Sequence, residues 1–167
     1  MTPGEIRTLF DYDRWATVKL LGVIGTISDD LYRKDLGSSH GGIHGTLVHL
    51  IGACDVWLRR WQGESPTKPW RDADFQSFAD LRTAWDTIQA ALAAYLETLS
   101  DEQLSSPLHY KDMKGNAYAT VLWKQMQHLV NHGSYHRGQI VTLLRIMGVT
   151  PVGTDLIHYY REKEKHA

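Results

Sequence analysis

The stretch Gln127–Arg145, which reads QHLVNHGSYHRGQIVTLLR, carries His128, His132 and His136 at four-residue intervals. On an α-helix this interval turns about 400°, so successive histidines lie one turn apart and only about 40° around the axis from each other. Imidazoles at positions i and i+4 can bind one metal ion from a single helix, as in the HExxH motif of zinc peptidases. The stretch therefore predicts a long helix that presents a candidate metal site.

The apolar residues of this helix indicate which histidines point inward. They recur with helical spacing at Leu122, Met126, Leu129, Gly133, Ile140, Leu143 and Met147. His136 falls on this stripe, whereas His132 lies about 40° and His128 about 80° away from it at about 100° per residue. We therefore expect His136 and His132 to point into the core and His128 to lie nearer the rim.

Spacing alone leaves two interpretations of these histidines open. They can be core or surface residues with ordinary hydrogen bonds, because histidine is intermediate in its tendency to be buried. Two inward histidines one turn apart favour a metal, because burying both costs free energy unless each ring nitrogen finds a partner. One cation satisfies a nitrogen of each ring at once.

The composition is that of one globular domain, which we expect to span residues 1–167. The chain has 167 residues, of which 43% are hydrophobic and 22% charged, enough for one core and too few for two ordinary ones. The net charge is −1 and no long basic run occurs, which argues against nucleic acid as a partner. Cys54 is the only cysteine, so any metal site must use histidines and carboxylates.

Neither export nor membrane association is indicated by the sequence. The first residues, MTPGEIRTLFDYDRW, lack the basic-then-apolar order of a signal peptide. No uninterrupted apolar run reaches the length of about 18 residues that a membrane span requires. We therefore expect a cytoplasmic protein.

The first helix is predicted to begin at a capping box, because Thr2 is followed by Pro3 and then by Glu5 three residues after Thr2. The apolar stripe of this helix includes Asp13. An acid on a buried stripe costs free energy unless it is paired or binds a ligand. Asp13 therefore either pairs with Arg14 or water at a polar edge, or orients a ligand histidine or binds the metal itself.

A second helix is expected from Ile43 to Trp61. His49 lies about 100° from the main apolar stripe of this helix, on a second face of small and apolar residues that another helix could approach closely. It is a third ligand candidate if that face meets the Gln127–Arg145 helix, and helical spacing does not decide this. We expect His40 and His44, in or beside the preceding loop, to be exposed to solvent.

Three further patterns complete the expected architecture. Residues 75–99 repeat apolar positions by three and four without a break, which predicts a long helix. Strand-forming residues flank Gly115 within residues 107–120, which predicts a small hairpin. The histidine helix follows over 121–147 and a short helix over 155–164. We therefore expect an all-α four-helix bundle with a β-hairpin insertion before the last long helix.

The chain resembles the DinB/YfiT-like family over most of its length. The resemblance rests on FDYDRWAT, on GTLVHLIGACDVWLRRWQGESP and on HLVNHGSYHRGQIVTLLRIMGVTPVGTDLIHYY. It implies a four-helix bundle with up-down-down-up connectivity, often dimeric, and a metal triad of one histidine on the second helix and two on the last. Matched by motif, these are His49, His132 and His136, while His128 matches a frequent family histidine outside the triad.

The resemblance also implies an activity. Members of the family include thiol S-transferases that use bacillithiol or mycothiol and a thiol-dependent maleylpyruvate isomerase, so a metal-dependent transferase or hydrolase acting on a small molecule is implied. Three histidine ligands leave coordination positions open, which is typical of catalytic zinc sites. We expect zinc or nickel, with iron or manganese as alternatives, because imidazole binds all four. A low-molecular-weight thiol is a candidate cosubstrate.

Asp13, His128 and Gln139 are candidates to orient a ligand histidine or to transfer protons. The alternative function is a non-enzymatic, stress-associated metal-binding protein whose bundle mainly mediates dimerisation. The six tryptophans and a helix with two apolar faces leave surplus apolar surface, which predicts a homodimer. A deep pocket beside an open metal site would favour the enzyme, and a closed four-ligand site without a cavity would favour the alternative.

Overall fold

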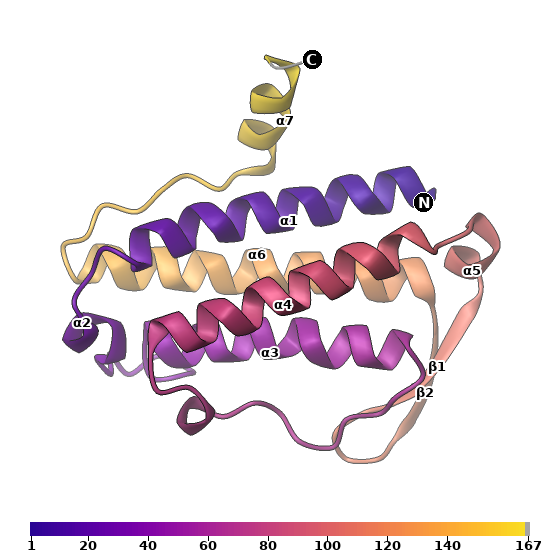
Figure 1. Cartoon of the computed structure of the whole chain (residues 1–167), viewed down its shortest axis with the longest axis horizontal. Helices are drawn as coiled ribbons and strands as arrows, with labels where there is room; N and C mark the ends of the chain where they lie inside the picture. The colour runs from indigo at the N-terminus through magenta and orange to yellow at the C-terminus, as the bar shows by residue number, and fades with distance from the viewer. Residues whose placement is uncertain (166–167) are drawn as a thin grey trace.

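The structure is a computed structural model that describes residues 1–165 and consists mainly of helices (Figure 1). The four long helices are α1 (Pro3–Ile24), α3 (Ile43–Trp61), α4 (Phe78–Glu97) and α6 (Leu122–Ile146). The short ones are α2 (Asp29–Arg33), the 3-10 turn η1 (Asp72–Asp74), α5 (Asp101–Ser105) and α7 (Leu156–Glu164). The last two residues of the domain predicted over 1–167, His166 and Ala167, lie outside the described part.

The four long helices run up-down-down-up. In Figure 1, α1 and α6 run from right to left, whereas α3 and α4 run from left to right. Because α3 and α4 are consecutive and yet parallel, the chain between them returns along the length of the bundle as the long loop 62–77, which contains η1 (Figure 1). The expected all-α bundle with this connectivity is therefore confirmed.

The predicted hairpin is also present. Strands β1 (Pro107–Lys111) and β2 (Ala117–Val121) pair antiparallel at the end of the bundle where α3 ends and α6 begins (Figure 1). Gly115 in the turn has a φ of +87°, a conformation that glycine adopts without steric cost. The carboxylate of Asp112 accepts hydrogen bonds from the backbone and side-chain N–H groups of Asn116, which stabilises the turn.

Helix α6 lies in the core between two other long helices. Fully buried apolar side chains come from every long helix, among them Ile6, Leu20, Leu47, Ile51, Leu81, Met126 and Ile140. Helix α6 packs against both α1 and α3. Its polar residues therefore fall into two separate interfaces according to their direction on the helix.

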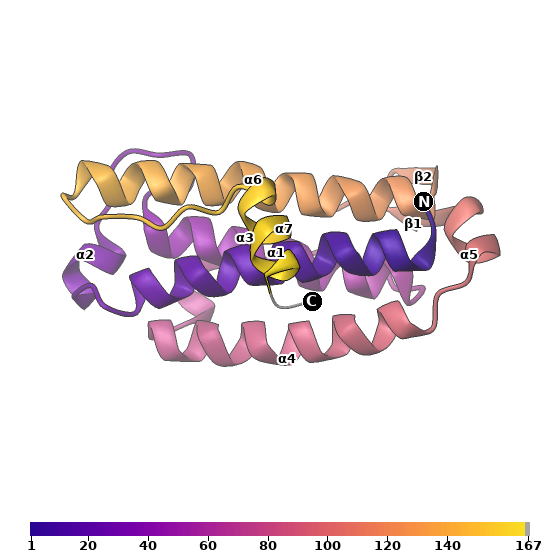
Figure 2. The same cartoon turned by 90° about the horizontal axis from the view of Figure 1, so that it is seen from above.

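Helix α7 lies across the outer face of α1 (Figure 2). Tyr159 anchors it, since the ring is buried and its hydroxyl donates a hydrogen bond to Asp11 over 2.7 Å. At the N-terminus of α1, Thr2 and Glu5 form the predicted capping box. Within residues 1–165, no helix combines the length and the apolar character that crossing a membrane requires.

Candidate metal centre

Four histidines from three segments gather between α3 and α6. His49 belongs to α3, His132 and His136 belong to α6, and His40 belongs to the loop before α3. The ring centre of His49 lies 5.1 Å from that of His132 and 4.5 Å from that of His136. His40 stacks on His49 with the ring centres 4.1 Å apart and the ring planes 17° from parallel. The face of α3 that carries His49 therefore does look toward α6.

Three of these rings turn the same nitrogen toward one another. Nε2 of His132 lies 3.1 Å from Nε2 of His49 and 3.1 Å from Nε2 of His136. A single ring N–H can point at only one of these neighbours, so hydrogen bonds among the rings cannot satisfy all three nitrogens. Two nitrogens bound to one zinc ion at about 2.0–2.1 Å lie about 2.9 Å apart at a right angle and about 3.4 Å apart at the tetrahedral angle. The observed separations fall within that range, so the rings fit a shared metal ion.

Gln139 determines the tautomer of His136. Nδ1 of His136 donates a hydrogen bond to the amide oxygen of Gln139 over 2.7 Å. In a neutral ring this leaves Nε2 with its lone pair free, which is the form that a metal ligand needs. His132 has no such partner, because its Nδ1 is buried and makes no hydrogen bond with any residue in 1–165. His132 can therefore gain a partner only through Nε2, which faces the other rings.

The surroundings keep these imidazoles neutral. Burial, together with the neighbouring His40 and His136, lowers the pKa of His49 to about 4. Burial, together with His136 and His49, lowers the pKa of His132 to about 4 as well. Burial also lowers the pKa of His136, against the opposing effect of its hydrogen bond to Gln139. Since metals bind the neutral ring, the cluster has the right protonation state at neutral pH.

Two geometric criteria disagree on whether His40 or His132 completes the triad with His49 and His136. His40, His49 and His136 can each offer a nitrogen such that all three lie within 4.8 Å of one another. The shortest nitrogen contacts instead join His132 to His49 and to His136, at 3.1 Å each. His132 is the better-supported third ligand, because its 3.1 Å contacts match the separation of two nitrogens on one ion, whereas the nitrogen of His40 lies within 4.8 Å of the other two. His40 is nevertheless half-buried rather than exposed, so the expectation for that residue was wrong.

A cavity of about 440 Å³ adjoins the histidines, a volume typical of small-molecule sites. His40, His49, His128 and His132 line one part of it, and residues of α3, loop 62–77 and the hairpin line the rest. Trp70 of the loop packs directly over Gly52, where an added Cβ would lie 3.2 Å from the Cβ of Trp70. Glycine at this position therefore lets the loop approach α3 closely and form part of the cavity wall.

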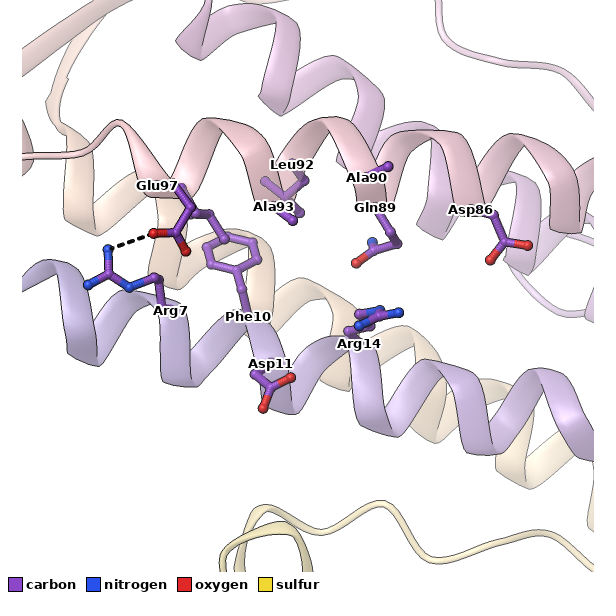
Figure 3. Close-up of a pocket in the computed structure, with 11 residues that line it drawn as sticks. Arg7, Phe10, Asp11, Arg14, Asp86, Gln89, Ala90, Leu92, Ala93 and Glu97 are labelled. Carbon is purple, nitrogen blue, oxygen red and sulfur yellow. Dashed lines mark ion pairs between the residues drawn. The ribbon is translucent and has the colours of Figure 1, made fainter. Parts of the chain in front are cut away.

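A slightly larger cleft of about 490 Å³ lies between α1 and α4 (Figure 3). Its walls include Phe10 and Leu92, and Arg7 forms an ion pair with Glu97 across it over 3.8 Å. None of the described residues that line it is a histidine or a cysteine. The smaller cavity is therefore the candidate site, because ligating nitrogens converge there and the described lining of the larger cleft offers none.

Comparison with known proteins identifies the family and agrees with the fold. A sequence profile of the DinB family matches residues 1–166. The chain belongs to the DinB family. It is 21% identical over 154 residues to Protein DinB of Bacillus subtilis (strain 168), with 88% of each chain covered. The crystal structure of a DinB-like protein from Bacillus cereus ATCC 10987 matches with a TM-score of 0.60 and 19% identity, covering 87% of this chain and 94% of that one. At this identity the structural match establishes the fold, and the resemblance noted in the sequence is confirmed.

Two other predicted residues of this DinB-family chain lie apart from the three facing nitrogens. His128 is exposed, with its ring centre 6.0 Å from that of His132 and 5.4 Å from that of Trp57. Asp13 is buried, as its place on the stripe indicated. Its carboxylate accepts a hydrogen bond from Nη1 of Arg137, and within residues 1–165 it makes none with a histidine. Asp13 thus adjoins the site only through the residue that follows His136.

His44 corrects a second expectation, because it is only 7% exposed. Its Nδ1 lies 2.8 Å from the hydroxyl of Tyr32, and its Nε2 lies 3.1 Å from the carbonyl oxygen of Asp72. A carbonyl only accepts, so Nε2 carries the proton and Nδ1 accepts from the tyrosine. Both nitrogens are satisfied, and His44 therefore ties η1 to α3 as a structural residue.

The single cysteine of this DinB-family protein is not a nucleophile. Cys54 is 5% exposed, in the core. Burial, and secondarily the charge of Asp13, raises the pKa of its thiol above the ordinary value. A neutral, inaccessible thiol is unreactive, so any thiol that reacts at this site must enter from outside.

Proposed function

We propose that this DinB-family protein binds one divalent transition metal ion through His49, His132 and His136 and activates a thiol or a water molecule for a transferase or hydrolase reaction. The observation that supports this is the pair of 3.1 Å separations from Nε2 of His132. Zinc or nickel is the expected ion, with iron or manganese as alternatives. The substrate is a small molecule, and a low-molecular-weight thiol is the proposed cosubstrate.

When bound, such an ion lowers the pKa of a ligated water or thiol, which becomes a nucleophile at neutral pH. The residues of the chain orient the ligand histidines and keep them uncharged. Gln139 holds the proton on Nδ1 of His136, and burial keeps His49 and His132 uncharged by lowering the pKa of each ring. Trp70 forms part of the cavity wall, and its ring reduces the contact of the reacting groups with bulk water, which strengthens electrostatic interactions there.

The alternative is a non-enzymatic metal-binding bundle that acts mainly through dimerisation. His40 is the observation that favours it, because a fourth imidazole beside His49 would close the coordination sphere. The cavity of about 440 Å³ favours the enzyme, since a purely structural metal site needs no space for a substrate. The homodimer itself is a proposal common to both functions.

Elemental analysis of protein purified without an affinity tag tests the proposal, with His136→Ala and His109→Ala measured beside it. His109 is exposed on β1, so its replacement is the control for the loss of any histidine. We expect about one transition metal ion per chain in the wild type and in His109→Ala, and a small fraction of that in His136→Ala. Circular dichroism should show that all three proteins are equally helical, because the apolar core is unchanged.

The absence of metal from the wild type after incubation with zinc, nickel or manganese would overturn the proposal. So would an equal metal content in His136→Ala and the wild type. A metal ion that is present but held in a saturated coordination sphere, as judged by X-ray absorption spectroscopy, would favour the structural alternative.

A further inference from the structure

Arg60 lies in the same cavity as the histidines and is only 7% exposed. Its guanidinium carbon lies 4.8 Å from the ring centre of Trp57 and 5.0 Å from that of Tyr110. The Arg60 side chain makes no hydrogen bond and no ion pair with any residue in 1–165, and its Nε is buried without a partner. This DinB-family protein therefore keeps a buried cation whose hydrogen-bond donors are unused.

The other arginines near Arg60 or near the core differ in this respect. Arg59, the next residue on α3, is exposed and pairs with Glu64 over 2.6 Å. Arg137 is buried and its Nε also lacks a partner within residues 1–165, but its Nη1 pairs with Asp13. Burying a cation without an anion costs free energy, and two aromatic rings compensate only part of that cost. An uncompensated buried cation that lines a cavity is typical of a site that receives an anion.

The negative charge of Asp112 is close enough to raise the pKa of Arg60 against the larger effect of burial, but the Asp112 carboxylate is engaged elsewhere. Its oxygens accept hydrogen bonds from the backbone N–H groups of Lys114 and Asn116 and from the side chain of Asn116. Asp112 therefore stabilises the hairpin turn and leaves the guanidinium of Arg60 free to face the cavity.

The distance between Arg60 and the histidines determines how long a molecule must be to contact both. Arg60 follows His49 by three turns of α3, which places the two Cα atoms about 16 Å apart and within about 20° of the same direction. Between them the cavity is lined by Gly52, Ala53 and Val56, which are small or apolar. A molecule that contacts both ends is therefore elongated, with an apolar middle.

We propose that Arg60 binds a carboxylate of the small molecule that reacts at the histidines, at the end of the cavity away from them. The parallel N–H groups of a guanidinium match the two oxygens of a carboxylate. The single charge of Arg60 favours a singly charged group over a dianionic phosphate, which would leave negative charge uncompensated in a half-enclosed site. The identity of the reacting end rests on the function proposed above, whereas the anion site itself does not.

The test uses phenylacetate and its neutral amide, phenylacetamide, as probes of chelator-treated protein, with affinities measured by saturation-transfer NMR. Arg60→Met keeps the length of the side chain and its contacts with the two rings but removes the charge. Arg59→Met is the matched control, because it removes the same charge from the neighbouring exposed position. Arg60→Lys keeps the charge without the paired donors, and circular dichroism verifies the fold of each variant.

We expect the wild type and Arg59→Met to bind phenylacetate more tightly than phenylacetamide. Arg60→Met should bind phenylacetate about tenfold more weakly or worse, the effect of losing a charged hydrogen bond, and phenylacetamide as before. Arg60→Lys should fall in between. Equal affinity of Arg60→Met and wild type for phenylacetate, or equal affinity of the wild type for the two probes, would overturn the proposal.

These results are independent of the metal. Chelator-treated protein carries no ion, so the carboxylate cannot bind to one, and the outcome does not depend on whether the histidines hold a metal. Elemental analysis of Arg60→Met should in turn give the wild-type metal content. The failure of the anion site and the failure of the metal site would therefore be observed in different measurements.

Discussion

Two adjacent residues of α6 serve two buried polar clusters of opposite character. Arg137 faces α1, where its guanidinium donates hydrogen bonds to Asp13, Thr17 and Ser134. His136 faces α3, where the ring nitrogens of His136, His132 and His49 turn toward one another. In the first cluster the two terminal nitrogens of Arg137 meet acceptors within the fold, so the network stabilises the bundle. In the second cluster three ring nitrogens face one another and the rings cannot satisfy all of them, which is the reason for proposing that a ligand is the missing partner.

The largest effect should come from breaking the first cluster. Asp13→Ala leaves Arg137, which is 1% exposed, as an uncompensated buried charge, and we expect a loss of about 3–5 kcal/mol in the free energy of unfolding. Urea denaturation of the metal-free protein measures this loss. Asp11→Ala is the control, because the Asp11 carboxylate is 46% exposed and its removal should cost about 0–1 kcal/mol. Similar losses in both variants would contradict the distinction.

The metal content of Asp13→Ala tests whether the two clusters are independent. If the two clusters are independent, the folded fraction of this variant should bind metal as the wild type does. A loss of metal in folded Asp13→Ala would show instead that the acid acts on the histidine site, as one interpretation of the sequence holds.

The second effect concerns the third ligand. We expect His132→Ala to weaken metal binding by more than about 100-fold, beyond what the loss of an outer-sphere partner causes. His40→Ala should weaken it by less than about tenfold, the least that the loss of a hydrogen-bonded outer-sphere partner costs, since His40 stacks on His49 without a hydrogen bond between the two rings. Competition with a chromophoric chelator measures both affinities. The reverse order would make His40 the ligand, and equally large losses would favour the closed, structural site.

An effect smaller than that of His132→Ala should come from Gln139→Leu. Removing the acceptor of the His136 Nδ1 proton should lower metal affinity by about 10–100-fold, as is typical for partners that orient a ligand histidine. The same competition assay applies. Gln127→Leu, at an exposed position of the same helix, should have no effect, and a matching loss there would show that the amide of Gln139 is not what matters.

The helices and their ends could be predicted because their signals are local. The expected second helix coincides with α3, and the apolar repeat over 75–99 contains α4 (Phe78–Glu97). The capping box at Thr2 and the glycine turn at Gly115 depend on residues within a few positions of each other. Such signals determine backbone conformation before any long-range contact forms, so one sequence suffices to recognise them.

The partners of polar residues could not be predicted in the same way. Asp13 was expected to pair with Arg14 or water or to serve the metal, and it pairs with Arg137, which is 124 positions away. His40 and His44 lie where the chain turns, and their burial depends on Gly45, where an added Cβ would lie 2.2 Å from the carbonyl oxygen of His40. The sequence does not distinguish Arg60 from Arg59. Only the folded structure shows that Arg60 is buried between two aromatic rings without a carboxylate partner in the described part of the chain.

Loop 62–77 exists because α3 and α4 run in the same direction (Figure 1), and the bundle needs little from it except length. The same segment carries Trp70 and Pro69 over the cavity. Lengthening a loop changes the free energy of folding only slightly, whereas new side chains over the cavity change what can enter it. Substrate choice in this architecture can therefore diverge between descendants of one ancestor through changes in a connecting segment, while the histidines and the helices that hold them stay the same.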